Sequence, residues 1–76
     1  MEYRNRIESD PNIMLGKPRI KGSRLTVELI LQKISDGYDF SEIEEMYPGL
    51  ERDDILACVG YAADILGTEV VIPSIS

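Results

Sequence analysis

The residues best suited to chemistry in this 76-residue chain are cations near its N-terminus. Lys17, Arg19, Lys21 and Arg24 lie within one short segment, and such cations can neutralise phosphates or enter the minor groove of DNA. Arg52, further along the chain, is suited to a guanine edge or a backbone phosphate. The sequence thus offers five candidate DNA-binding residues. The N-terminal cluster is equally typical of a solvated loop, and the residue types alone leave both interpretations open.

The charge is distributed unevenly along the chain. Residues 1–24 carry six cations and three acids, a net charge of +3, whereas residues 25–76 carry two cations and eleven acids, a net charge of −9. The two sums agree with the formal net charge of −6. A basic arm attached to an acidic body indicates binding to charged partners.

The remaining reactive side chains point away from catalysis. There is no histidine and a single cysteine, Cys58, which excludes His-based triads and zinc sites built from imidazole or several thiolates. Cys58 is expected to be a small packing residue. The neighbouring acids Asp53–Asp54 and Glu44–Glu45 would point about 100° apart on a helix, which disfavours a metal site. We therefore expect no enzyme activity, no cofactor and no metal.

Composition predicts a small globular protein of the cytoplasm. Hydrophobic residues make up 43% of the chain and charged residues 29%, as in folded domains. No apolar run reaches the roughly 18 residues that a membrane span needs, and neither the cysteine count nor the opening residues suggest secretion. A chain of this size buries only about 62% of its unfolded surface. The core is therefore marginal, and a homodimer is expected.

Two helices are predicted in the first part of the acidic body. Val27, Ile30, Leu31 and Ile34 have helical spacing, and with Thr26 as N-cap and Gly37 after the last turn they predict a helix over 27–36. Residues 41–44 have the pattern of a capping box opened by Ser41. A second helix is therefore predicted over 42–47, ending before Pro48.

The third predicted helix begins near Arg52 and ends at Gly67. Glu51, Asp53 and Asp54 surround its first turn, where the helix dipole favours carboxylates. The same position reads base edges in helix-turn-helix proteins, but three carboxylates would repel phosphates. Stabilisation of the helix start is therefore the better account of these acids. A short helix, a turn and a longer helix form a helix-turn-helix pattern, which also occurs as a plain packing arrangement.

The segments outside these helices are predicted to be extended. In the basic arm, residues 1–25, the alternation around Ile20 predicts short strands, with Ile20 inward and both Arg19 and Lys21 facing solvent. The tail, residues 68–76, contains the β-prone run Val70-Val71-Ile72. Between them lies the predicted three-helix domain, residues 26–67. The predicted fold class is therefore mainly α, with a short N-terminal β hairpin.

Several segments of the chain resemble one bacterial family. They are 10–13 (Asp-Pro-Asn-Ile), 16–25 (Gly-Lys-Pro-Arg-Ile-Lys-Gly-Ser-Arg-Leu), 47–48 (Tyr-Pro), 53–58 (Asp-Asp-Ile-Leu-Ala-Cys) and 61–63 (Tyr-Ala-Ala). Over about residues 7–66 the chain resembles the domain of unknown function 433 (DUF433) family of small antitoxin-like proteins. The resemblance implies a homeodomain-like three-helix fold with a short N-terminal β element. The chain departs from the family at Leu15, where glycine is frequent, and at Ser23 and Glu51, where threonine is frequent.

The resemblance also implies a partner, a PIN-like ribonuclease toxin of a type II toxin–antitoxin module. Such a nuclease holds divalent metal with a cluster of carboxylates, and an antitoxin can block it with a cation placed among them. Arg19 and Arg24 are the candidates for that role. Val70, Val71 and Ile72 are candidates for adding a strand to the toxin's sheet. Two other functions stay open: a stand-alone DNA-binding transcriptional regulator, and an assembly module without a ligand.

Overall fold

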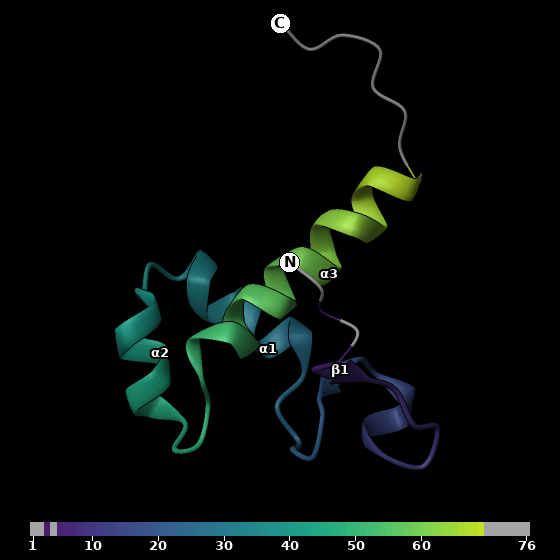
Figure 1. Cartoon of the computed structure of the whole chain (residues 1–76), viewed down its shortest axis with the longest axis horizontal. Coiled ribbons are helices and arrows are strands. Elements are labelled where there is room, and N and C mark those ends of the chain that lie inside the picture. Colours follow the sequence, from purple (N-terminus) through teal and green to yellow (C-terminus); the bar gives the residue numbers. More distant parts are fainter. Residues whose placement is uncertain (1–2, 4, 70–76) are drawn as a thin grey trace, which may run out of the picture.

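The part of the chain that the structure describes contains three α-helices, one short 3-10 helix and a two-stranded sheet (Figure 1). The computed structural model describes residue 3 and residues 5–69. The elements follow in the order β1 (Ile7–Glu8), the short 3-10 helix η1 (Met14–Gly16), β2 (Arg19–Ile20), α1 (Val27–Ser35), α2 (Phe40–Met46) and α3 (Arg52–Glu69). The structure therefore confirms a mainly α fold with a short N-terminal hairpin.

The hairpin belongs to the folded body. β1 and β2 pair antiparallel, with Ile7 opposite Ile20 and Glu8 opposite Arg19. Ile20 is buried, as predicted, but Arg19 is only 5% exposed, so the prediction that Arg19 faces solvent is wrong. In a strand whose successive side chains point to opposite faces, the side chain next to the buried Ile20 would face solvent. Here the chain from Ser23 to Thr26 folds back over β2, forming a second antiparallel bridge between Arg19 and Thr26, and covers that side.

Helix α1 begins at Val27, as its sequence predicts, and ends at Ser35, one residue before the predicted end. The Thr26 hydroxyl accepts the backbone N–H of Leu29 at 3.0 Å, so Thr26 is the N-cap. Gly37 follows the helix with a φ of +100°, the left-handed conformation that glycine adopts without strain. Val27 and Ile30 are buried. The apolar spacing in this segment therefore identified the face of α1 that packs on the core.

Helix α2 begins two residues earlier than predicted. Asp39, rather than Ser41, is the N-cap: its carboxylate accepts the Glu42 N–H, and the Glu42 carboxylate accepts the Asp39 N–H, both at 2.8 Å. Residues 39–42 and 41–44 both fit the capping-box pattern. The earlier start places Phe40 within the helix, where its ring packs against the core. This packing accounts for the choice between the two patterns.

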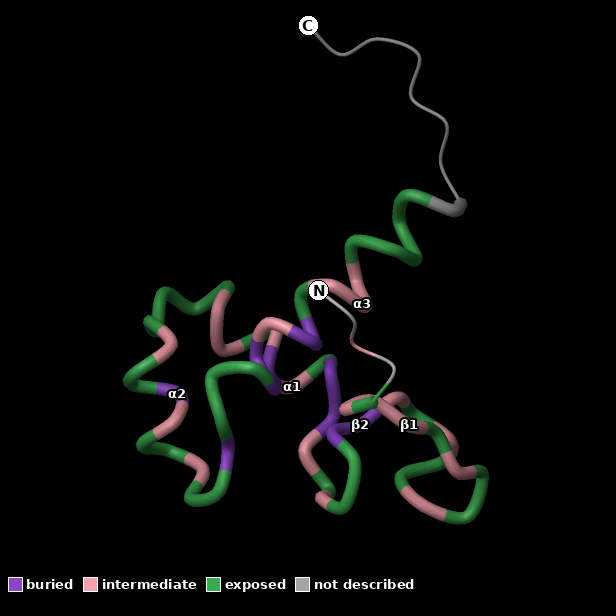
Figure 2. The backbone as a smooth tube through the Cα atoms, viewed as in Figure 1, coloured by how far each residue is buried: buried purple, intermediate pink, exposed green. Residues whose placement is uncertain are grey.

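Helix α3 divides into a packed half and a projecting half. It begins at Arg52, as predicted, but continues through Gly67 to Glu69, so the predicted end at Gly67 is wrong. A glycine inside a helix costs only about 1 kcal/mol. Buried residues cluster where α1, α2, β2 and the first half of α3 meet, whereas the second half is mostly exposed (Figure 2). The core residues are Ile20, Val27, Ile30, Ile43, Leu50, Ile55 and Cys58.

The N-terminal segment is fastened along α3. The ring of Tyr3 meets the ring of Tyr61 edge-on, with centroids 5.5 Å apart, and the Tyr3 hydroxyl donates to the Asp64 carboxylate at 2.7 Å. Edge-to-face aromatic pairs stabilise by roughly 1 kcal/mol beyond their buried area. The arm therefore contacts α3 at this point as well as through the hairpin.

The turn between β1 and β2 holds its chain in an unusual conformation. Met14 and Leu15 have positive φ angles of 53° and 58°, and Gly16 follows at 79°. For a residue with a side chain this conformation costs roughly 1–2 kcal/mol. Leu15 is also 93% exposed, so packing of its own side chain does not offset the cost. Leucine at this position therefore introduces strain.

No helix within residues 3 and 5–69 is long and apolar enough to cross a membrane. The predicted β-prone run Val70–Val71–Ile72 lies outside the described residues.

Candidate functional site

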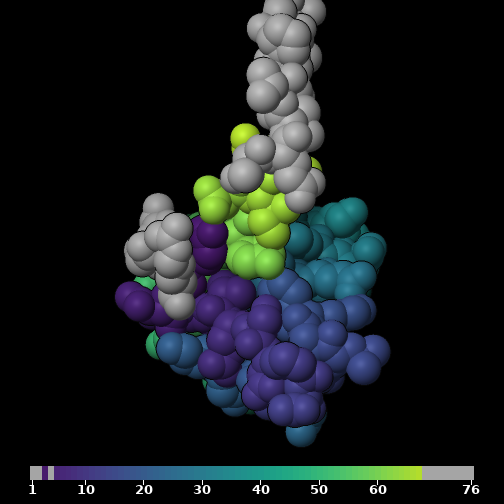
Figure 3. Space-filling view, turned by 90° about the vertical axis from the view of Figure 1, so that its right-hand side faces the viewer, coloured from purple at the N-terminus to yellow at the C-terminus, as the bar shows by residue number. Residues whose placement is uncertain are grey.

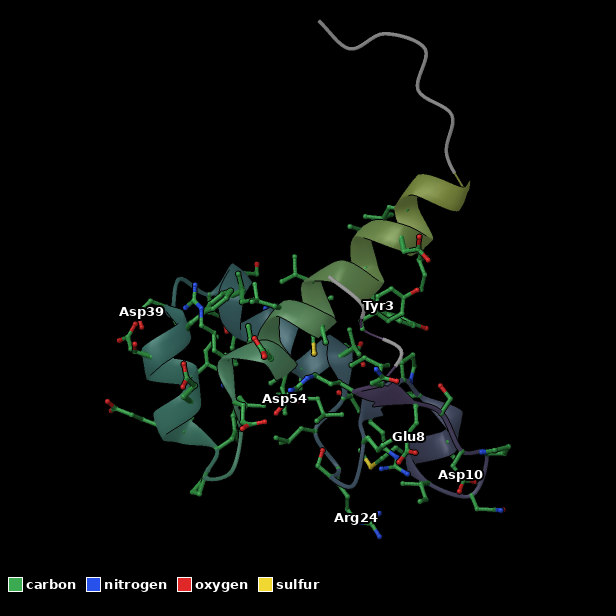
Figure 4. All side chains as sticks on the ribbon, viewed as in Figure 1. Tyr3, Glu8, Asp10, Arg24, Asp39 and Asp54 are labelled. Carbon is green, nitrogen blue, oxygen red and sulfur yellow. The ribbon has the colours of Figure 1, made fainter. Side chains whose placement is uncertain are left out.

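The exposed cations of the arm lie in the loop that joins β2 to α1 and in the approach to β2. Lys21 and Arg24 are both exposed, and Arg24 extends away from the body (Figure 4). Lys17 is half-exposed, and its Nζ lies 2.8 Å from the Glu28 carboxylate at the start of α1. The structure therefore places three of the five predicted DNA-binding residues where a phosphate or carboxylate from another molecule can reach them.

Arg19 is instead enclosed by its own chain. Its Nη1 donates to the backbone carbonyl of Ser23 at 2.7 Å, and its Nη2 lies 2.9 Å from the Glu8 carboxylate. Its Nε is buried and has no hydrogen-bond partner among residues 3 and 5–69. The guanidinium thus holds β1 to the loop after β2. Contact of Arg19 with DNA or a toxin stays a prediction, and it requires this arrangement to open.

The start of α3 carries a cluster that the sequence did not reveal. The guanidinium of Arg6 lies 3.0 Å from Glu51, 3.0 Å from Asp54 and 3.6 Å from Asp53. These carboxylates, through the hydrogen bonds to Glu51 first and Asp54 next, raise the pKa of Arg6 above its ordinary value. Arg6 was visible only as one cation of the basic arm. Its partners are 45 or more residues away, and no short-range pattern relates such positions.

The acids at this helix start stabilise the helix, in agreement with the sequence interpretation. Asp54 is buried. One oxygen of its carboxylate accepts a hydrogen bond from the backbone N–H of Glu51 at 3.0 Å, and the other accepts a hydrogen bond from the Arg6 guanidinium. Carboxylates satisfy free N–H groups and complement the dipole at a helix N-terminus. The exposed carboxylates of Glu51 and Asp53 remain at the surface that would read base edges.

Arg52, the fifth predicted DNA-binding residue, packs against α2. Its guanidinium carbon lies 4.9 Å from the centre of the Phe40 ring, a cation–π distance. Glu51 and Asp53 flank Arg52 in the chain and are exposed beside it. The start of α3 therefore combines one ring-stacked cation with two exposed acids.

The single thiol is unsuited to nucleophilic chemistry. Cys58 is fully buried, and burial, with a further contribution from the negative charge of Asp54, raises the pKa of its thiol to about 12. The nucleophile is the thiolate, which is scarce at neutral pH in such a site. Cys58 is thus a core residue, as predicted. Among residues 3 and 5–69, no three potential metal-ligating side chains (His, Cys, Asp or Glu) gather into a possible metal site.

Comparison with known proteins identifies one family. A family model described as a protein of unknown function (DUF433) matches residues 7–62, well over half of the chain. The match includes the hairpin, α1, α2 and the packed half of α3. No curated protein and no solved structure shows significant similarity to the chain.

Proposed function

The chain belongs to the DUF433 family of proteins of unknown function, and we propose that it is a non-enzymatic, antitoxin-like protein that inhibits a PIN-like ribonuclease toxin. The observation that carries the proposal is the separation of opposite charges on one small domain. The exposed cations Lys21 and Arg24 lie beside the hairpin, and exposed acids lie on and before α2. Arg24 and Asp39, which precedes α2, lie well apart on the body (Figure 4).

Arg24 is the residue that enters the toxin's carboxylate cluster in this proposal. An arginine can engage a carboxylate through two parallel hydrogen bonds, and it replaces part of the charge of the divalent metal there. Arg24 presents an exposed head group, whereas Arg19 is engaged by Glu8 and Ser23. The toxin-binding role therefore falls on Arg24 before Arg19.

The acidic part of the domain supplies the second contact. A ribonuclease needs a basic surface to hold RNA, and the exposed carboxylates of Asp39, Glu42 and Glu45 complement such a surface. Binding of these carboxylates to the basic surface competes with RNA, and binding of Arg24 competes with the metal. Strand addition by Val70, Val71 and Ile72 stays a further element of the proposal.

DNA binding is the second candidate function, and the exposure of Lys21 and Arg24 favours it. In this case the three helices act as a homeodomain-like helix-turn-helix, either for autoregulation or in a stand-alone regulator. The loop cations, rather than the start of α3, contact the phosphates. Lys17, Lys21 and Arg24 predict a log–log salt slope of about −3 per protomer. Absence of duplex binding at low salt would refute this function.

Co-expression with the product of a neighbouring reading frame tests the antitoxin proposal. We expect the tagged chain to co-elute with that product at a fixed ratio and to restore growth of the host. Arg24→Glu should abolish the rescue, while Lys33→Glu, the same charge change on α1, should leave it intact. Neither co-elution nor rescue with the wild type would contradict the proposal. A stable oligomer that binds neither this product nor DNA would instead indicate an assembly module.

A further inference from the structure

A polar hollow lies beside the hairpin, around the guanidinium of Arg19. Its volume is about 500 Å³, a size typical of ligand sites. Its lining residues are Glu8, Ile13, Arg19, Gly22, Ser23 and Arg24. In Figure 3 the purple residues of the hairpin and the blue segment that leads into α1 form part of the face toward the viewer. Two arginines and one glutamate give the lining a net positive charge on a chain of net charge −6, which favours an anionic ligand.

Glu8 already places a carboxylate at this hollow. Its Oε2 lies 2.9 Å from Arg19 Nη2 and accepts the backbone N–H of Gly22 at 3.3 Å. Glu8 is paired opposite Arg19 in the hairpin, so its backbone is fixed relative to the guanidinium. These contacts identify the chemistry that the hollow accepts: a carboxylate, received by an arginine and a backbone N–H.

The guanidinium of Arg19 is only partly used by Glu8. Both contacts of Glu8 are made by one oxygen, Oε2, and Arg19 Nε is buried without a hydrogen-bond partner among residues 3 and 5–69. Nε and Nη2 lie on the same edge of the planar guanidinium, where the two oxygens of one carboxylate can each accept a hydrogen bond. Buried donors without an acceptor are rare in folded proteins. A carboxylate that is not tethered to β1 can therefore satisfy an N–H that Glu8 leaves unpaired.

We propose that this hollow binds an acidic side chain of a partner protein, which takes the place of Glu8. The incoming carboxylate accepts hydrogen bonds from Nη2 and Nε of Arg19, and the exposed Arg24 in the lining adds a second cation. Glu8 can leave without opening the core, because its side chain is 34% exposed and is not part of the core cluster. The inference rests on the proposed function only for the identity of the partner, whose metal-binding carboxylates then supply the ligand.

Binding of a capped peptide to the full chain tests the site without a toxin. Acetyl-Gly-Glu-Gly-amide is titrated at constant ionic strength while the NMR signals of the Arg19 Nε–H and the Gly22 amide are followed. We expect this peptide to shift both signals and the uncharged acetyl-Gly-Gln-Gly-amide to shift neither. Only molecules in which Glu8 is displaced can bind, and the apparent affinity is reduced by that fraction. Glu8→Gln should therefore lower the dissociation constant at least about tenfold.

Two further variants separate exchange at Arg19 from general electrostatics. Asp10→Asn is the matched control, because it removes the same charge two residues further along the chain, outside the lining of the hollow. It should change the dissociation constant by less than about threefold, since solvent screens its charge. Arg19→Lys keeps the positive charge but lacks the edge with two donors, and it should abolish the shift of the Gly22 signal. Thermal melts confirm that each variant is folded, and Glu8→Gln tests the site even if Arg19→Lys unfolds.

Three outcomes would overturn the inference. The first is an equal affinity of wild type and Glu8→Gln for the glutamate peptide. The second is the absence of any shift in Glu8→Gln. The third is binding of inorganic phosphate, titrated in the same way, without binding of the glutamate peptide, since the hollow would then be a phosphate site. Inhibition of a toxin by a chain that does not bind the peptide would overturn this inference and leave the proposed function standing.

Discussion

Among the described cations of the basic arm, Arg6 and Arg19 differ from Lys21 and Arg24 in how far they face outward. Arg6 and Arg19 are engaged by carboxylates of their own chain, at the start of α3 and on β1 respectively. Lys21 and Arg24, a few residues further on, are exposed. The sequence gives all four the same charge. The difference teaches that a charge count identifies a basic arm, but the acids that the fold brings to it decide which cations are available for binding.

The cations that are engaged by carboxylates of their own chain should contribute more to the free energy of unfolding than the exposed cations. Replacement of Arg19 by alanine leaves the Glu8 carboxylate and the Ser23 carbonyl without this partner. We expect the free energy of unfolding to fall by about 3 kcal/mol, since Glu8 is one-third exposed and water offsets part of the loss. Urea unfolding of Arg19→Ala measures this loss, with Arg24→Ala, a change at an exposed cation, as the control. A loss below about 1 kcal/mol for Arg19→Ala would contradict the structural role of Arg19.

Relief of the backbone strain at Leu15 should change stability in the opposite direction, by raising the free energy of unfolding. Leu15→Gly removes a side chain that is 93% exposed from a residue with a φ of +58°. We expect the protein to gain about 1 kcal/mol of stability, because relief of the left-handed strain exceeds the entropy that glycine adds to the unfolded chain. Thermal melts of Leu15→Gly and Leu15→Ala separate the two effects, since alanine shortens the side chain without relieving the strain. Equal melting temperatures for the two variants would exclude strain at Leu15.

The Arg6 cluster should contribute less than Arg19 and depend on salt. Arg6→Ala leaves three acids adjacent at the start of α3, so the melting temperature should fall. The fall should be smaller than in Arg19→Ala, because the Arg6 side chain is more accessible to solvent than that of Arg19. The difference from the wild type should narrow as the salt concentration rises from about 0.05 M to about 0.5 M, because solvent-accessible charges are screened. A difference independent of salt would indicate a packing role for Arg6 instead.

The smallest effect is expected at the Lys17–Glu28 pair. The hydrogen bond from Lys17, with its positive charge, lowers the pKa of Glu28 below its ordinary value of 4.5. The stability from this pair is fully present above pH 4.5 and is lost as the pH falls through the lowered folded-state pKa. The difference in melting temperature between wild type and Glu28→Gln should therefore disappear at acid pH. A difference that grows on acidification would be inconsistent with the pair.

The parts of the fold set by local patterns were predictable. Thr26 and Gly37 mark the two ends of α1. They could be identified in the sequence because capping and the left-handed turn depend on a few adjacent residues. Two overlapping capping boxes obscured the start of α2, and the packing of Phe40 decided between them. Burial of Arg19 was not predictable, because it depends on the chain from Ser23 to Thr26 folding over β2. For the candidate site, the exposure of Lys21 was predicted from the alternation around Ile20, whereas the Arg6 cluster depends on residues far apart in the chain.

Inhibition of RNA cleavage tests the central claim most directly. The candidate toxin, purified separately, is assayed on RNA with the full chain added at increasing molar ratio. We expect cleavage to stop near one chain per toxin molecule and to persist with Arg24→Glu, whose folding should match that of the wild type because Arg24 is exposed. Unchanged cleavage with the wild-type chain at a stoichiometric ratio would contradict the inhibitory function.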